Sequence, residues 1–348
     1  MQTVLTYPYG EPETRAVLKS SAADFEVEEV LGFEPVGEGE HLFLWVEKSG
    51  LGTMELITRM AKDHGLPERD FGYSGQKDKH ALTRQWLSLH LPGKEAPFEL
   101  PSGEGYRVLR QLRHHKKLRP GTHKFNRFSL CLREVHELSE KTQQQLDRVQ
   151  KQGFANYFGH QRFGRKQDNV EQALAQLGTR KLSRTRKSML LSSLRSYLFN
   201  RILNSRIELG HWETPLAGDV FMLRGSHSIF ADELDDALLE RHRQQDVSVC
   251  ASLYGSGRSL MSGDAAQIEQ RVFAENAEIT DCLQRNDSRL QMRPLRVAAE
   301  AFSYDYDSAA ALLRLELSLP TGCYVTTMLA HFLVLDDASQ AKKSIVAH

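Results

Sequence analysis

The chain has 348 residues, of which 40% are hydrophobic and 26% are charged, as is ordinary for a globular protein with its own core. Its 45 basic and 45 acidic side chains balance, so the net charge says nothing about partners. No apolar run approaches the ~20 residues of a membrane helix, and the first residues lack the pattern of a secretory signal. The four cysteines form no CxxC pair, so neither disulfides nor a zinc knuckle are expected. Together these features favour a cytoplasmic protein without membrane contact.

The N-terminal part predicts strands that alternate with helices. A helix is expected over Met54–His64, with Thr53 as its N-cap and Gly65 as its end. Its expected apolar stripe is Met54, Ile57, Met60 and Ala61. Period-two patterns and apolar runs predict strands over 25–31, 42–46, 71–74, 86–91 and 125–135.

The middle of the chain is richer in helical patterns. Helices are predicted over 186–209, 231–241 and 264–276, and strands return over 296–306 and 313–319. A start and an end rich in strands therefore enclose a helical middle. We interpret the chain as an α+β fold over 1–153 and 295–348, interrupted by an inserted domain over 154–294.

Basic residues gather in two stretches that contain no acid. One runs from Arg107 to Arg133 and the other from Gln172 to Arg206. Either could be an ordinary solvated surface, but two such stretches in a neutral chain favour a partner with a phosphate backbone.

The stretch from Gly72 to Trp86 holds the densest set of polar residues. Asp78 lies between Lys77 and Lys79, but in an extended segment immediate neighbours point to opposite faces. Asp78 therefore needs a cationic partner from elsewhere in the chain, and Lys19 is our candidate. On composition alone, an exposed turn of mixed charge is the favoured explanation of the stretch. The spacing of a phosphate-binding P-loop is absent.

A second stretch, Asn156–Gly164, interleaves aromatic residues with Arg162 and two glycines. Such a surface can stack bases, although a buried aromatic turn fits the same residues. Gln161 and Arg162 could orient a ligand or brace a domain junction, and we favour bracing. No set of side chains has the spacing of a metal site, so we expect no metal.

At this point several segments resemble the TruD family of tRNA pseudouridine synthases. The strongest match is Gly75-Gln76-Lys77-Asp78-Lys79-His80-Ala81, followed by Thr83 and Gln85-Trp86. Three more agree in order: Lys19 with Asp24-Phe25-x-Val27-x-Glu29, the block Gly37–Leu42 with Lys48 and Thr53, and Asn156–Gly164. The resemblance covers nearly the whole chain.

The resemblance implies a role for individual residues. Asp78 falls on the catalytic aspartate of the family, and Lys19 on the basic residue beside it. Phe25 falls on the aromatic residue that stacks on the target uracil, and Asn126 on a residue that contacts the substrate. Gln76 and Lys77 belong to the same motif and are expected to bind substrate. Tyr324 falls where the family often has a phenylalanine that lines the pocket, which weakens that match.

The family implies a mixed, largely antiparallel sheet with flanking helices and an inserted α/β domain. It also implies isomerisation of a uridine in tRNA, at position 13, without cofactor or metal. No water need be activated, because the base that leaves the sugar is the one that returns, so one carboxylate suffices. We expect a monomer. The competing interpretations are a metal-dependent nuclease and an RNA-binding module or RNA chaperone in which the Asp78 motif is structural.

Overall fold

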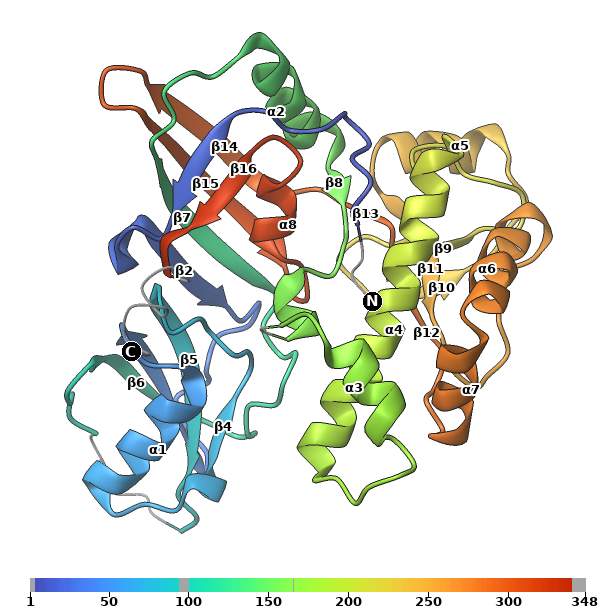
Figure 1. Cartoon of the computed structure of the whole chain (residues 1–348). Coiled ribbons are helices and arrows are strands. Elements are labelled where there is room, and N and C mark those ends of the chain that lie inside the picture. Colours follow the sequence, from blue (N-terminus) through green and yellow to red (C-terminus); the bar gives the residue numbers. More distant parts are fainter. Residues whose placement is uncertain (1–3, 94–99, 165, 340–348) are drawn as a thin grey trace. The chain divides into compact units, whose positions relative to one another are not determined.

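The computed structural model describes residues 4–93, 100–164 and 166–339 (Figure 1). Its chain forms two compact units, each built from separate segments. One unit comprises Glu13–Gln143, Ala299–Gly322 and Leu333–His348, and we call it the sheet unit. The other comprises Met1–Pro12, Gln144–Ala298 and Cys323–Phe332, and we call it the helical unit. The predicted domain boundaries, 1–153 with 295–348 against 154–294, stay a prediction.

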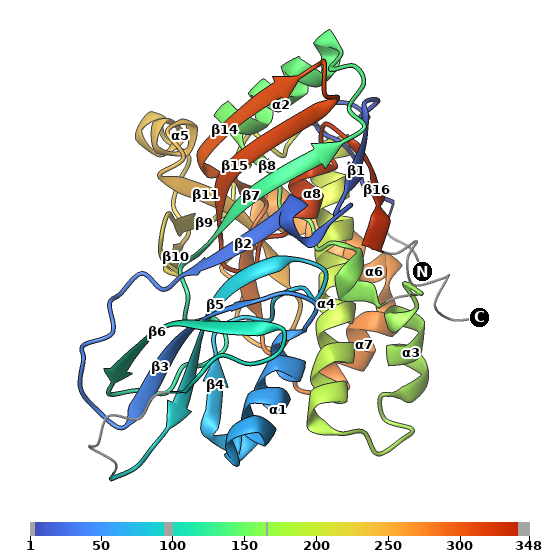
Figure 2. The same ribbon diagram turned by 90° about the vertical axis from the view of Figure 1, so that its left-hand side faces the viewer.

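The sheet unit is organised around ten strands (Figure 2). Seven follow one another across the sheet in the order β14-β15-β7-β2-β5-β3-β6, and β1, β4 and β16 pair beside them. Among the strands that the structure describes in this unit, β2 with β5 and β1 with β16 pair in parallel, and the other pairs are antiparallel. The strands are β1 (Arg15–Leu18), β2 (Phe25–Val30), β3 (His41–Lys48), β4 (Phe71–Tyr73), β5 (Leu82–His90), β6 (Tyr106–His114), β7 (Phe125–Arg133), β14 (Glu300–Asp307), β15 (Leu312–Pro320) and β16 (Val334–Asp337). The predicted mixed, largely antiparallel sheet is confirmed.

Helix α1 (Thr53–His64) supplies part of the core of the sheet unit, and Gly65 ends it with a left-handed φ of 64°. The N-cap prediction was wrong by one residue: Gly52 is the cap and Thr53 is the first helical residue. The hydroxyl of Thr53 is buried, where it donates to Gln85 and accepts the main-chain N–H of Lys77. The predicted stripe was wrong at Met54, which is 45% exposed, because the buried face runs through Leu56 instead.

The helical unit contains a four-stranded sheet in the order β10-β9-β11-β12 and the long helix α4, whose contacts include β11, α3 and α6 (Figure 1). Its elements are β8 (Phe154–Ala155), α3 (Asn169–Gln176), α4 (Arg184–Glu208), β9 (Val220–Leu223), β10 (Ile229–Phe230), α5 (Asp236–Arg243), β11 (Val247–Leu253), α6 (Gly263–Glu275), α7 (Ala277–Arg285), β12 (Gln291–Pro294), β13 (Arg296–Val297) and α8 (Val325–Leu329). Helix α2 (Glu140–Gln152) spans the sequence boundary between the units.

Two further predicted boundaries were wrong for local reasons. The helix expected from residue 231 begins at Asp236, because the side chain of Asp235 caps it by accepting the N–H of Leu238 at 2.7 Å. The strand expected over 296–306 is divided into β13 and β14. The register of β14 shifts after Glu300, where Ala301 has a φ of 50°. No helix among the described residues is long and apolar enough to span a bilayer.

A buried carboxyl in the helical unit predicts how stability varies with pH. Burial raises the pKa of Glu269 to about 7, although its Oε1 accepts the N–H of Ser252 at 2.7 Å. Because the folded pKa exceeds the unfolded one, the folded state binds the proton more tightly. The contribution of Glu269 protonation to the free energy of unfolding is complete below the unfolded pKa, and it is lost as pH rises through about 7.

We therefore expect Glu269→Gln to abolish about 3 kcal/mol of the difference in unfolding free energy between pH 4.5 and pH 8. Denaturant unfolding of both proteins at the two pH values measures this difference. An unchanged pH dependence in the variant would contradict the assignment to Glu269.

Candidate active site

Asp78 lies in the loop between β4 and β5, and the structure brings it together with the predicted partner Lys19. The Lys19 ammonium donates a hydrogen bond to Asp78 Oδ2, and Oδ1 accepts the main-chain N–H of His80 at 3.0 Å. The Lys19 side chain is 2% exposed and that of Asp78 is 27% exposed. The pair is therefore shielded on the lysine side and open to solvent on the aspartate side.

The electrostatics of this pair favour an ionised carboxylate. Burial acts to raise the pKa of Asp78, but the charge of Lys19 and the hydrogen bonds from Lys19 and His80 outweigh it, so the pKa lies below its usual range. Lys19 follows β1 and has a left-handed φ of 60°. Asp337 of β16, the parallel neighbour of β1, lies 3.8 Å from the same ammonium.

Lys48, at the end of β3, holds the main chain of the Asp78 loop. Its ammonium is buried and donates to the carbonyl oxygens of Leu51 at 2.6 Å and Asp78 at 3.0 Å. Burial lowers the pKa of Lys48 to about 8, against the opposing charge of Asp78. Lys48 thus fixes the backbone from which the carboxylate projects.

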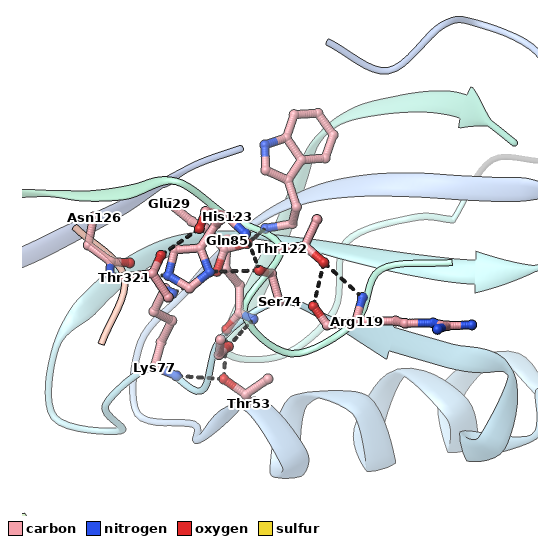
Figure 3. A network of polar contacts seen from close by, with 12 residues as sticks. Glu29, Thr53, Ser74, Lys77, Gln85, Arg119, Thr122, His123, Asn126 and Thr321 are labelled. Atoms are coloured by element: carbon pink, nitrogen blue, oxygen red, sulfur yellow. Dashed lines mark hydrogen bonds and ion pairs between the residues drawn. The ribbon is translucent and has the colours of Figure 1, made fainter. Parts of the chain in front are cut away.

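Lys77 and Lys79, the sequence neighbours of Asp78, are both bound elsewhere. The Lys77 ammonium contacts Glu29 Oε2 at 2.6 Å in a buried ion pair (Figure 3). Lys79 forms an exposed pair with Glu55 at 2.9 Å. The argument from side-chain direction, that Asp78 takes its cation from elsewhere in the chain, agrees with this geometry.

The other predicted site residues of the sheet unit lie on β2, on β7 and in the Asp78 loop. Phe25 begins β2 and is 5% exposed. Its ring lies edge-on to Phe128, with its centroid 4.6 Å from the Lys19 ammonium. Asn126 lies on β7, opposite Glu29 of β2. Gln76 is exposed in the Asp78 loop. The substrate-binding roles of Phe25, Asn126, Gln76 and Lys77 stay predictions.

A buried polar network that the sequence did not reveal lies beside the Asp78 loop (Figure 3). It joins Glu29 and Lys77 to Ser74 and His123. His123 lies within the acid-free stretch 107–133, but it is 5% exposed, and burial lowers its pKa to about 4, so it carries no charge at neutral pH. A histidine within a basic stretch gives no sequence signal of burial.

Tyr324 belongs to the helical unit, where Arg162 contacts it. Arg162 Nη2 donates to the Tyr324 hydroxyl at 2.9 Å, while Nη1 donates to Ser192 at the same distance. Phe158 packs edge-on to the Tyr324 ring, with 6.2 Å between the ring centroids. These contacts lie within one unit, so the favoured role of Arg162, bracing a domain junction, stays a prediction.

The hydrogen bond from Arg162 to Tyr324 depends on the Tyr324 hydroxyl, which a phenylalanine at this position would lack. We expect Tyr324→Phe to lower the unfolding free energy by about 1 kcal/mol, the usual net contribution of such a bond. Denaturant unfolding measures the change. The matched control is Tyr197→Phe in the same unit, because the Tyr197 hydroxyl has no hydrogen-bond partner among the described residues. Equal effects of the two substitutions would contradict a specific contribution from Arg162.

Comparisons with known proteins agree on one family. The family model described as tRNA pseudouridine synthase D (TruD) matches residues 3–175 and 165–332. A tRNA pseudouridine synthase D of Aeromonas salmonicida is 40% identical over 337 residues, 96% of this chain and 95% of that protein. One of Hydrogenovibrio crunogenus is 36% identical over 329 residues, 93% and 94% of the two chains.

A solved structure carries the same fold. The crystal structure titled as a putative tRNA pseudouridine synthase D from Methanosarcina mazei superposes with a TM-score of 0.67 and covers 95% of this chain and 96% of that one. Its sequence identity is 19%, so this comparison supports the architecture alone. The predicted fold class is confirmed.

Proposed function

The chain belongs to the tRNA pseudouridine synthase D (TruD) family, and from that premise we propose that it converts a uridine in tRNA to pseudouridine with Asp78 as the catalytic carboxylate. The observation that carries the proposal is the ion pair of Asp78 with the buried Lys19, in the motif by which the chain resembles the family. We propose position 13, in the D-arm, as the site of modification.

The reaction suits one ionised carboxylate. The bond between N1 of uracil and C1′ of ribose breaks, and a bond from C5 to C1′ forms. The proton on C5 is lost and N1 gains one, so atoms balance without water or an oxidant. Asp78 supplies negative charge where the sugar becomes electron-poor, or forms a bond to the reacting carbon. Its lowered pKa keeps it in the required state at neutral pH.

The other site residues would handle the base. An extruded uracil loses its stacking in the RNA, and an aromatic ring can restore about 1–3 kcal/mol of it. Phe25 is proposed for this role, with Asn126, Gln76 and Lys77 as polar contacts and Tyr324 as a further aromatic contact. We further propose that the protein acts in the cytoplasm as a monomer, without metal or cofactor. Its four cysteines are free thiols, which suits a reducing compartment.

The test is incubation of the purified protein with an unmodified tRNA transcript in EDTA, followed by carbodiimide treatment and primer extension. A single new stop in the D-arm is the expected result. A stop that appears only when metal is added would overturn the cofactor-free mechanism. Binding of tRNA without any stop would overturn the enzymatic function in favour of an RNA-binding module.

Binding of tRNA should weaken steeply with salt. Neutralised phosphates release counterions, so a protein that makes about six phosphate contacts loses roughly a thousandfold in affinity between 50 and 200 mM salt. Filter binding of the transcript at several salt concentrations measures the slope. A flat response would contradict contacts from the acid-free stretches 107–133 and 172–206.

A further inference from the structure

The imidazole of His123 lies between Ser74 and Asn126 (Figure 3). Its Nδ1 is 2.6 Å from the Ser74 hydroxyl oxygen, and its Nε2 is 3.2 Å from the side-chain amide of Asn126. The main chain of His123 is also held: its N–H donates to Ser74 Oγ at 2.6 Å, and its carbonyl accepts the hydroxyl of Thr321. The ring therefore has a fixed position beside a predicted substrate contact.

The hydrogen bonds around Ser74 decide which ring nitrogen carries the proton. A neutral imidazole has one N–H, and His123 is neutral because burial and the nearby charge of Lys77 lower its pKa. Ser74 Oγ already accepts the main-chain N–H of His123, so its own hydrogen is free to be donated. Nδ1 is the acceptor within reach. Donation from Ser74 to Nδ1 places the ring proton on Nε2, whereas an Nδ1–H would have to share Ser74 Oγ with the main-chain N–H or turn toward Glu29 Oε2, 3.9 Å away.

The tautomer in turn orients Asn126. An N–H at Nε2 needs an acceptor, and the amide oxygen of Asn126 is the one at hand once the amide is turned, since its oxygen and nitrogen have the same shape. The opposite orientation leaves Asn126 Oδ1 buried without a partner among the described residues. With the oxygen on His123, the NH₂ group of Asn126 takes the buried place that has no partner among the described residues, so its hydrogens are unsatisfied until a ligand reaches them.

We propose that Ser74 and His123 are positioning residues that hold Asn126 so that its NH₂ group donates to a carbonyl oxygen of the target uracil. This proposal rests on the function proposed above. Uracil offers two such oxygens, whereas an amide with its oxygen outward could pair only with the N3–H of the base. The Ser74–His123 pair therefore selects the donor face of Asn126.

The first test reads the tautomer directly. Long-range proton–nitrogen NMR correlations of the full chain labelled at histidine nitrogen distinguish an Nε2–H from an Nδ1–H ring. The His123 signals are those lost in His123→Gln. An Nε2–H tautomer is expected, and an Nδ1–H tautomer would overturn the proposal. This measurement needs no activity, so it decides the tautomer even if the proposed function fails.

The second test is a double-mutant cycle in single-turnover pseudouridine formation. In the wild-type background, Ser74→Ala should lower the rate about tenfold and leave the tRNA concentration for half-maximal rate unchanged. In an Asn126→Ala background, the same substitution should lower the rate by less than about twofold. Ser88→Ala is the matched control, because its buried hydroxyl accepts the N–H of Leu118 instead, and it should leave the rate unchanged. Independent, multiplying effects of Ser74→Ala and Asn126→Ala would overturn the proposal, as would a Ser88→Ala loss equal to that of Ser74→Ala.

Discussion

Replacing Asp78 by asparagine should lower the single-turnover rate of pseudouridine formation by more than about a thousandfold while the variant still binds tRNA. Asparagine keeps the size of the side chain and an oxygen that can accept the N–H of His80, which Asp78 Oδ1 accepts at 3.0 Å. It removes the negative charge that the chemistry requires. Affinity should be retained because the lost charge is of the same sign as the phosphates.

The control for this substitution is Asp305→Asn, which removes an exposed carboxylate of the same unit. Asp305 lies 3.5 Å from Arg314 at a position where its side chain is 76% exposed. Exposed pairs contribute about 0–1 kcal/mol, so the activity should not change. An active Asp78→Asn enzyme would contradict the catalytic role. An inactive variant that has also lost its fold, judged by denaturant unfolding, would support a structural role for Asp78 instead.

The architecture followed from the sequence where burial alternates regularly. Along β7 the alternation of Phe128, Leu130 and Leu132 with polar residues places the strand, and the structure buries these three. Boundaries were less predictable where a side chain makes a tertiary contact. Thr53 is a good N-cap by local preference, yet its hydroxyl is engaged by Gln85 and Lys77, which come from other parts of the chain.

The candidate site was predictable only in part. For an extended segment, side-chain direction indicated that the lysines beside Asp78 are not its partners, but it did not point to Lys19, 59 residues away, whose place beside the aspartate is what the family resemblance implies. The network of Glu29, Ser74 and His123 gave no such signal, because burial converts a histidine from a cation into a neutral hydrogen-bonding group. That conversion depends on packing that a single sequence does not display.

Replacing Lys19 by methionine should lower the single-turnover rate at pH 7 by about a hundredfold, the scale seen when one charged or donor group is removed from an active site. Methionine fills a similar volume but removes the cation. Asp78 then keeps the burial that raises its pKa and loses the largest opposing influence. Its pKa should therefore rise. Because the ionised form is the active one, the rate of the variant should fall as pH decreases through this raised pKa, at a pH where the wild type is still fully active.

Lys79→Met provides the matched control, since Lys79 adjoins Asp78 in sequence but pairs with Glu55, and both partners are about half exposed. Such a pair contributes little, so the control should retain its rate within about twofold and keep the pH profile of the wild type. Single-turnover rates from pH 5 to 9 distinguish the two lysines. If Lys19→Met lowered the rate equally at every pH, Lys19 would act on the position of Asp78 or on the substrate, and not on the charge of the Asp78 carboxylate. If Lys79→Met shifted the profile, the cation that keeps Asp78 ionised would be the neighbour in sequence, against the geometry of the ion pair.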